Sequence, residues 1–112
     1  MLAVMAGLLH AEPGVTPTSI LIGQSAAFSG AASELGTEMR TGAAAYFRVI
    51  NAAGGVNGRK IELRSLDDGY ESDRAAANTK KLIDDGVFLL FGYVGTPTSN
   101  ARSEERRVGK EC

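Results

Sequence analysis

The 112-residue chain contains no tryptophan, a single histidine (His10) and a single cysteine, Cys112, at its last position. One cysteine cannot build a disulfide framework or a thiolate metal site, and it gives no information about the compartment. A strong excess of charge is also missing, because 12 Lys and Arg residues face 13 Asp and Glu residues, for a net charge of −1. We therefore expect no metal ion, no nucleic-acid partner and no attraction to an acidic membrane surface.

Long hydrophobic runs are missing as well. The apolar run Leu2–Leu9 is far shorter than the roughly 20 residues that a membrane-spanning helix needs. It has the length of a signal-peptide core and is followed by His10-Ala11, an acceptable cleavage site, although no Lys or Arg precedes Arg40. We expect residues 1–11 to be a signal-peptide remnant and residues 12–18 to be a flexible arm, which implies a periplasmic protein. The alternative is a mildly apolar chain start with no targeting role.

The last eleven residues differ abruptly from the rest. The segment 102–112 reads RSEERRVGKEC, and written as codons it can be encoded by a common short-read sequencing adapter. We therefore expect residues 102–112 to be non-native, with the biological sequence extending as far as Ala101. The alternative is the solvated, charged end of a helix.

Between these ends the hydrophobic pattern alternates between strand and helix. Short apolar runs at residues 19–23 and 87–91 are typical of buried strands, and alternation over residues 60–66 indicates a strand near a sheet edge. Helical spacing joins the apolar residues Leu35, Met39, Ala43, Phe47 and Ile50. A second helix ends before Gly86, and Thr96-Pro97 is typical of the start of a third. Residues 19–101 therefore predict an α/β fold, a three-stranded parallel βαβαβ unit with strand order 2-1-3.

The loops after the predicted strands exclude several α/β classes. The loop after the first strand lacks G-x-G-x-x-G, and Gly36 is followed by Thr37 where a P-loop would have lysine. Acidic residues that a phosphoacceptor domain would need after the first and third strands are missing. We therefore expect no cofactor and no catalytic residues, because no usual catalytic constellation can be assembled from residues 20–101.

Short motifs along the chain carry a family resemblance. The most specific is INAAGGVNG over residues 50–58. The others are Phe28-Ser29-Gly30, Leu35-Gly36, Gly42-Ala43-Ala44, Ile61-Glu62-Leu63, Asp67-Asp68, Phe91-Gly92 and Gly95-Thr96-Pro97-Thr98-Ser99. With these motifs the chain resembles the periplasmic substrate-binding proteins of ABC transporters of the leucine/isoleucine/valine-binding type.

The resemblance implies that residues 19–101 are the first part of lobe one of a longer, two-lobed binding protein. Such a protein is no enzyme; it captures a branched-chain amino acid, or a similar small amino acid or amide, between its lobes and delivers it to a membrane ABC permease. A sensory receptor domain of the same fold and a cytosolic α/β enzyme are the alternatives. Some family members carry a disulfide between the loops after strands two and three, and its absence here leaves the solute open.

The candidate ligand contacts lie in the loops that follow the predicted strands, at the carboxyl edge of the sheet. Small ligands bind outside the carboxyl ends of parallel strands, and a helix N-terminus attracts a carboxylate. The candidates are Tyr93, Gly95, Thr96, Thr98 and Ser99 at the third helix, with Phe28, Ser29 and Leu35 as a wall after the first strand. The alternative is that residues 96–99 only cap a helix. Asp67-Asp68 predicts a solvated loop with one capping acid, and for Tyr70 a place near the ligand and a place away from it are equally favoured.

Overall fold

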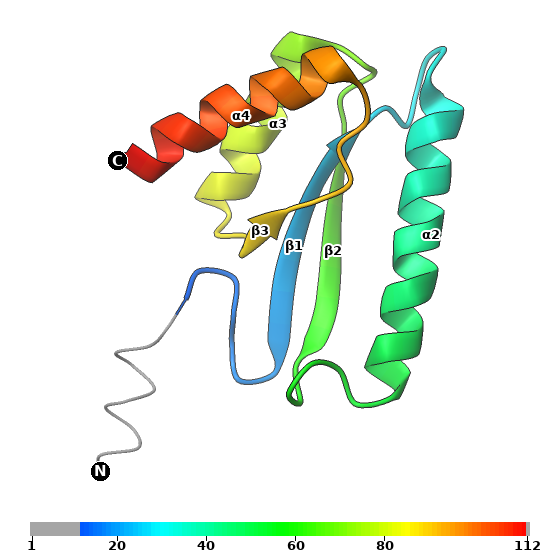
Figure 1. The fold of residues 1–112 in the computed structure, drawn as a ribbon, viewed down its shortest axis with the longest axis vertical. Helices are drawn as coiled ribbons and strands as arrows, with labels where there is room; N and C mark the ends of the chain where they lie inside the picture. The colour runs from blue at the N-terminus through cyan, green and yellow to red at the C-terminus, as the bar shows by residue number, and fades with distance from the viewer. Residues whose placement is uncertain (1–11, 112) are drawn as a thin grey trace.

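The computed structural model describes residues 12–111, with side chains as far as Ser103. The predicted leader and Cys112 lie outside these residues. The elements in chain order are β1 (Ser19–Ala26), α2 (Ser33–Ala52), β2 (Lys60–Asp67), α3 (Ser72–Asp84), β3 (Leu89–Leu90) and α4 (Thr96–Glu111) (Figure 1). No helix within residues 12–111 is both long and apolar enough to cross a membrane.

The sheet has the predicted topology. Its order is β2-β1-β3, and β1 pairs in parallel with both neighbours. The register with β2 runs from Ser19 opposite Lys60 to Ala26 opposite Asp67. β1 is therefore longer than the expected strand at residues 19–23, and its end lies beside the end of β2 at one edge of the sheet.

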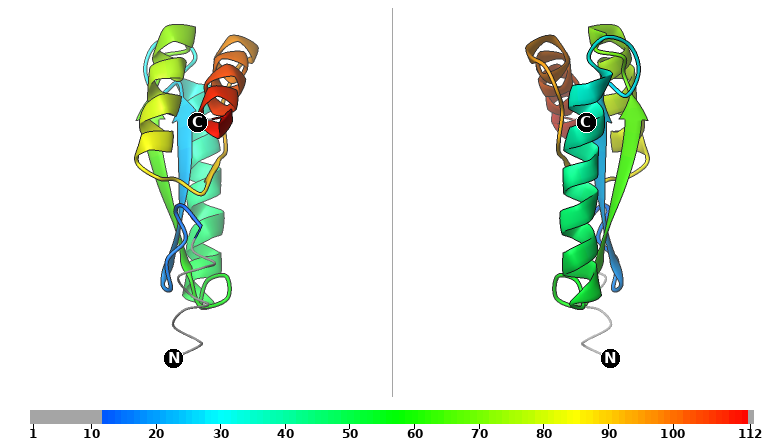
Figure 2. Two further views of the ribbon diagram at one scale, coloured as in Figure 1. Left: turned by 90° about the vertical axis from the view of Figure 1, so that its left-hand side faces the viewer. Right: turned by 90° about the vertical axis from the view of Figure 1, so that its right-hand side faces the viewer.

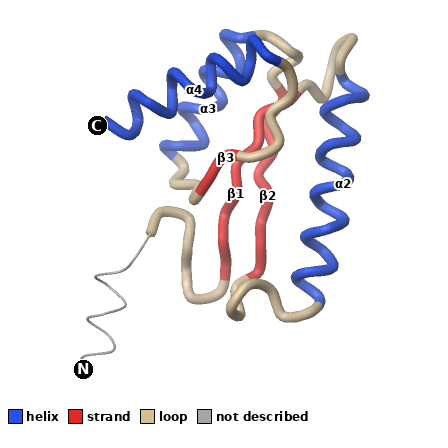
Figure 3. The backbone as a smooth tube through the Cα atoms, in the orientation of Figure 1, coloured by secondary structure: helices blue, strands red, loops and turns tan. Residues whose placement is uncertain are grey.

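Helices cover both faces of this sheet. α2 lies on one face, whereas α3 and α4 lie together on the other (Figures 1 to 3). α3 buries Ala75, Thr79 and Leu82 completely. A Cβ on Gly23 of β1 would lie 3.1 Å from the Leu82 side chain, so a glycine at this position allows α3 to approach the sheet closely.

The predicted apolar stripe of α2 is only partly directed at the sheet. Phe47 is half-buried, and its ring centroid lies 6.2 Å from that of Phe91. Leu35 and Met39 are instead 61% and 42% exposed, and Gly36 is the buried residue of the first turn. Because steps of four residues drift around a helix with 3.6 residues per turn, a stripe that faces the sheet at Phe47 has left it at Leu35.

The segment 87–91, predicted as a central buried strand, forms only the two-residue strand Leu89–Leu90 at the sheet edge. Phe88 and Leu89 are 45% and 42% exposed. The prediction of burial was wrong for these residues because β3 has only β1 as a neighbour within the described chain, so one side and part of one face stay open.

Residues 12–18 form hydrogen-bonded turns beside β1. The Leu21 amide donates to the Gly14 carbonyl at 2.7 Å, and Val15 forms an antiparallel bridge with Ile20. A Cβ on Gly14 would overlap the Phe88 backbone, so this turn also packs against the segment that leads into β3.

Candidate functional site

Three loops meet at the carboxyl edge of the sheet, where ligands of parallel α/β proteins bind. They are residues 27–32 after β1, residues 68–71 after β2 and residues 91–95 after β3. We refer to these loops as loop 1, loop 2 and loop 3. Their side chains and backbone groups form the candidate site.

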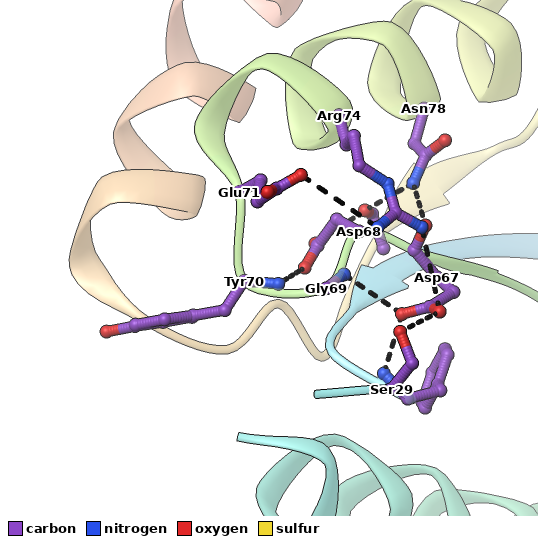
Figure 4. Close-up of polar contacts among 10 residues, drawn as sticks. Ser29, Asp67, Asp68, Gly69, Tyr70, Glu71, Arg74 and Asn78 are labelled. Atoms are coloured by element: carbon purple, nitrogen blue, oxygen red, sulfur yellow. Dashed lines mark hydrogen bonds and ion pairs between the residues drawn. The ribbon is translucent and has the colours of Figure 1, made fainter. Parts of the chain in front are cut away.

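Asp67, the last residue of β2, ties loop 1 to loop 2. Its carboxylate accepts hydrogen bonds from the Ser29 hydroxyl at 2.6 Å, the Phe28 amide at 2.8 Å and the Gly69 amide at 2.9 Å. Arg74 of α3 lies 3.6 Å from the same carboxylate (Figure 4). The Ser29 hydrogen bond, followed by the backbone amides and the positive charge of Arg74, lowers the pKa of Asp67 to about 2. Asp67 is therefore ionised across the physiological range and fixes the position of loop 1.

Asp68 has different surroundings and is completely buried. One of its oxygens accepts from the Ser25 hydroxyl of β1 at 2.7 Å, and the other accepts from the Tyr70 amide at 2.8 Å. Asn78 of α3 donates to both Ser25 and the Asp67 carbonyl. The expectation of a solvated loop with one capping acid was wrong, because both carboxylates are used as internal hydrogen-bond acceptors.

Loop 2 reaches loop 3 through Tyr70. The Tyr70 side chain extends away from the two aspartates toward the segment before α4 (Figure 4). Its ring lies against the Gly95 backbone so closely that a Cβ on Gly95 would overlap it. Tyr70 is 44% exposed, which makes it part of the site surface. The sequence left the position of Tyr70 open because the contact depends on the backbone geometry of two separate loops.

The residues predicted at the third helix lie where α4 begins. α4 starts at Thr96 as predicted, and Thr96 is exposed at its N-terminus. The Ser99 amide donates to the Gly95 carbonyl at 3.1 Å, and the Ser99 side chain is half-buried. Thr98 is fully buried, and its hydroxyl donates to the carbonyls of Val94 and Gly95. Thr98 therefore stabilises the helix start internally, whereas Thr96 is exposed; Pro97 has no amide hydrogen, so the amides of Thr96 and Thr98 are the ones that the first turn can offer.

The remaining predicted residues are more dispersed. The Ser29 hydroxyl is held by Asp67, and the Phe28 ring lies 4.1 Å from the Arg40 guanidinium carbon. Leu35 is mostly exposed. Tyr93 is directed at α3, where its hydroxyl lies 2.6 Å from that of Thr79, and burial is the main cause that raises its pKa. At the predicted wall, Arg40 of α2 thus lies over the Phe28 ring of loop 1, and Leu35 of α2 adds exposed apolar surface.

Two buried polar residues at the end of β1, Gln24 and Ser25, were not predicted. Gln24 of β1 is 1% exposed, accepts from the Ser65 hydroxyl at 2.7 Å and donates to the Gly92 carbonyl at 3.0 Å. It links β1 to β2 and to loop 3 just below the site. Its place in a buried, otherwise small and apolar strand is the only sequence signal that could have indicated this role.

Two surface hollows lie away from this edge. One is lined mainly by the segment before β3 together with Ile83 and Arg102, and the other by residues of α2 and β2 that include Phe47 and Ile61. Both lie where helices pack on the sheet, so we place the site at the carboxyl edge, where polar groups converge. Among the described side chains, no group of three or more His, Cys, Asp or Glu residues is placed to hold a metal ion.

Known proteins are similar to this chain in sequence and in architecture. A family model described as "Periplasmic binding protein" matches residues 19–104. The Leu/Ile/Val-binding protein homolog 3 of Brucella melitensis is 33% identical over 89 residues, which are 76% of this chain and 24% of that protein.

Two solved structures extend the comparison. A fatty acid ABC transporter substrate-binding protein from Thermomonospora curvata superposes with a TM-score of 0.82 at 28% identity, over 88% of this chain and 25% of that one. The branched-chain amino acid transporter substrate-binding protein LivJ from Streptococcus pneumoniae, in complex with isoleucine, gives a TM-score of 0.78 at 29% identity, over 82% of this chain and 27% of that one.

The βαβαβ unit with strand order β2-β1-β3 matches a lobe of the type I periplasmic binding proteins. The chain belongs to the periplasmic binding protein family, and it is similar to leucine/isoleucine/valine-binding members of that family. It spans about a quarter of the length of the relatives that it matches.

Proposed function

We propose that the protein is the extracytoplasmic solute-binding component of an ABC importer, and that it captures an amino acid or a related small solute between two lobes. Family membership over residues 19–104 carries this proposal. The relatives that the chain matches are named as binding proteins, and one of them is a branched-chain amino acid transporter substrate-binding protein. A membrane permease is the partner to which such a protein delivers its solute.

The site residues support a carboxylate-bearing solute. Thr96 is exposed at the first position of α4, where unpaired backbone amides and the positive end of the helix dipole favour an anion. Loop 2 and loop 3 are held in place by buried hydrogen bonds, so this surface is preorganised. Capture then follows from closure of the second lobe over the solute.

Calorimetric titration tests the proposal on the complete reading frame that contains this sequence. Leucine, isoleucine, valine and glutamate are titrated in turn, with a medium-chain fatty acid added because one relative is named for fatty acids. We expect saturable one-site binding of at least one amino acid with a Kd of about 1 μM or below. A folded protein that binds only the fatty acid, or none of the panel, contradicts the proposal.

Thr96→Ala locates the binding within the site. Removing a hydroxyl that bonds a charged ligand group weakens binding by roughly ten-fold. The matched control is Thr41→Ala, which removes the same hydroxyl from an exposed position in the middle of α2. Equal affinities of the two variants would remove Thr96 from the site.

A further inference from the structure

Tyr70 has a backbone conformation that a tyrosine adopts only when its surroundings impose it. Its φ is 68°, in the left-handed region, where a bulky side chain is an outlier. The Tyr70 amide donates to Asp68 at 2.8 Å, and Asp68 is buried and accepts from Ser25 of β1. A conformation that is unfavourable for this residue type is therefore held by a buried carboxylate anchored to the central strand.

The ring that this conformation directs outward lies on the residue before α4. A Cβ built on Gly95 would meet three atoms of the Tyr70 ring, of which Cζ and Cδ1 would lie at 2.8 and 2.9 Å. Gly95 itself has a φ of 95°, and its carbonyl accepts the Ser99 amide of the first turn of α4. Two unusual backbone conformations thus meet at one contact between loop 2 and loop 3.

The contact between the Tyr70 ring and Gly95 is one of packing. Ser25, Asp68, Tyr70 and Gly95 together form a continuous connection from β1 to the start of α4. β3, the strand that leads into loop 3, has only two residues and one strand neighbour among the described residues. The strand alone therefore constrains loop 3 weakly. Gln24 holds the Gly92 carbonyl and Thr79 holds Tyr93, whereas the Tyr70 ring is the contact from loop 2 that reaches Gly95 at the start of α4.

We propose that Tyr70 is a positioning residue for ligand binding, and that its ring fixes loop 3 so that the N-terminus of α4 faces the carboxyl edge of the sheet. This inference rests on the proposed function. Because the ring does the positioning, the phenol hydroxyl is dispensable. Gly95 is required because the Tyr70 ring packs directly on its backbone, where a Cβ would overlap the ring.

The first test is spectroscopic and does not depend on a ligand. Nuclear magnetic resonance of the ¹⁵N-labelled complete protein should show a ring-current shift of the Gly95 resonances. Tyr70→Phe should retain that shift, whereas Tyr70→Gly, which also relieves the left-handed backbone, should abolish it. A Gly95 spectrum that Tyr70→Gly leaves unchanged would overturn the contact.

The second test measures affinity for the amino acid that the wild-type protein binds best. We expect Tyr70→Gly to raise the Kd by about ten-fold and Tyr70→Phe to change it by less than about two-fold. Equal losses in both variants would assign the effect to the hydroxyl and overturn the proposal.

A double-mutant cycle adds a control for the backbone strain at Gly95. Gly95→Ala introduces the same unfavourable φ in every background, but it meets the ring only when Tyr70 is present. It should therefore weaken binding more in the wild type than in Tyr70→Gly, and an equal effect in both contradicts the ring contact.

Failure of this inference is distinguishable from failure of the proposed function. If the folded wild-type protein binds no solute of the panel, the proposed function and the positioning role fall together. If the wild type binds and Tyr70→Gly binds equally well, only the positioning role is overturned.

Discussion

Asp67 and Asp68 are adjacent in the sequence but serve different loops. Asp67 is partly exposed and binds loop 1, whereas Asp68 is buried and binds Ser25 and the Tyr70 amide. The sequence placed the pair in the loop after the second strand, whereas Asp67 is the last residue of that strand and only Asp68 follows it. It could not assign their partners, because Ser25, Ser29 and Asn78 reach them only after three elements have packed together.

Asp67→Asn tests the electrostatic part of this arrangement. The folded-state pKa of Asp67 is about 2, below its ordinary value of 3.8. A depressed pKa contributes stability that is fully present above about pH 4 and is lost as the pH falls from there through about 2. The carboxylate is one-third exposed, so we expect a loss of only about 1 kcal/mol at pH 7 for the variant.

Urea unfolding of the complete protein at pH 7 and at pH 2.5 checks this prediction. The difference between Asp67→Asn and the wild type should shrink at the lower pH, because the wild-type carboxylate is then partly protonated. Glu38→Gln, on the exposed side of α2, is the control for a general change in charge. A difference that stays constant with pH would show that the hydrogen bonds at Asp67 do not depend on its charge.

At the scale of elements, hydrophobic periodicity predicted the alternation of strands and helices and the order β2-β1-β3. Hydrophobic periodicity was less reliable where the burial of a residue depends on which elements lie beside it. Residues 87–91 read as a buried strand because their side chains are uniformly apolar, yet only Leu89–Leu90 pair with β1. Periodicity reports which residues can be buried, whereas the neighbouring elements decide which of them are.

Substitution of two glycines of α2, Gly36 and Gly42, should have opposite effects on stability. A Cβ on Gly36 would overlap the Ala27 backbone, whereas a Cβ on Gly42 would meet nothing within 4 Å. We expect Gly36→Ala to destabilise the protein by about 2 kcal/mol or more, since backbone atoms must move. Gly42→Ala should stabilise it by about 0.5–1 kcal/mol, because alanine has the higher helix propensity.

Thermal unfolding of the two variants gives the comparison directly, because the substitution and the helix are the same. The melting temperature should fall for Gly36→Ala and rise slightly for Gly42→Ala. A similar change in both variants would mean that α2 does not pack against loop 1 as described.

At the scale of the whole molecule, large apolar side chains are exposed on both sides of the sheet. They include Leu35, Val49, Phe88 and Leu89, with exposed fractions of 42% to 66%. Burial of such a side chain is worth about 1.5–3 kcal/mol, and a domain has a total margin of only about 5–15 kcal/mol. The exposed edge of β3 also offers a template for aggregation.

We therefore expect the 112-residue polypeptide by itself to be partly molten or aggregated and to bind no amino acid with useful affinity. Scanning calorimetry should show no sharp transition, and a hydrophobic dye such as ANS should bind strongly. A cooperative transition together with micromolar binding would show that this polypeptide is a self-sufficient binding domain.

The non-native origin of the charged C-terminal segment, residues 102–112, remains a prediction. Arg102, its first residue, has a buried Nε without a hydrogen-bond partner among the described residues. Its guanidinium also lies 5.2 Å from the Tyr93 ring centroid, so the packing of Arg102 does not distinguish a native from a non-native segment, and the prediction rests on the codons alone. Sequencing the source DNA with different adapters should diverge at residue 102, and the same eleven codons in the native locus would refute the prediction.

The central claim is that the carboxyl edge of this sheet binds the solute, with the start of α4 at its carboxylate. It is tested most directly by amide chemical-shift mapping of the ¹⁵N-labelled complete protein, titrated with the amino acid that it binds best. We predict that the largest amide chemical-shift changes occur at Gly95, Thr96 and Ser99. Saturable binding with the largest shifts instead at Ile61 and Leu63, or at Ile83 and Leu90, would place the solute in one of the two flanking hollows and contradict the account.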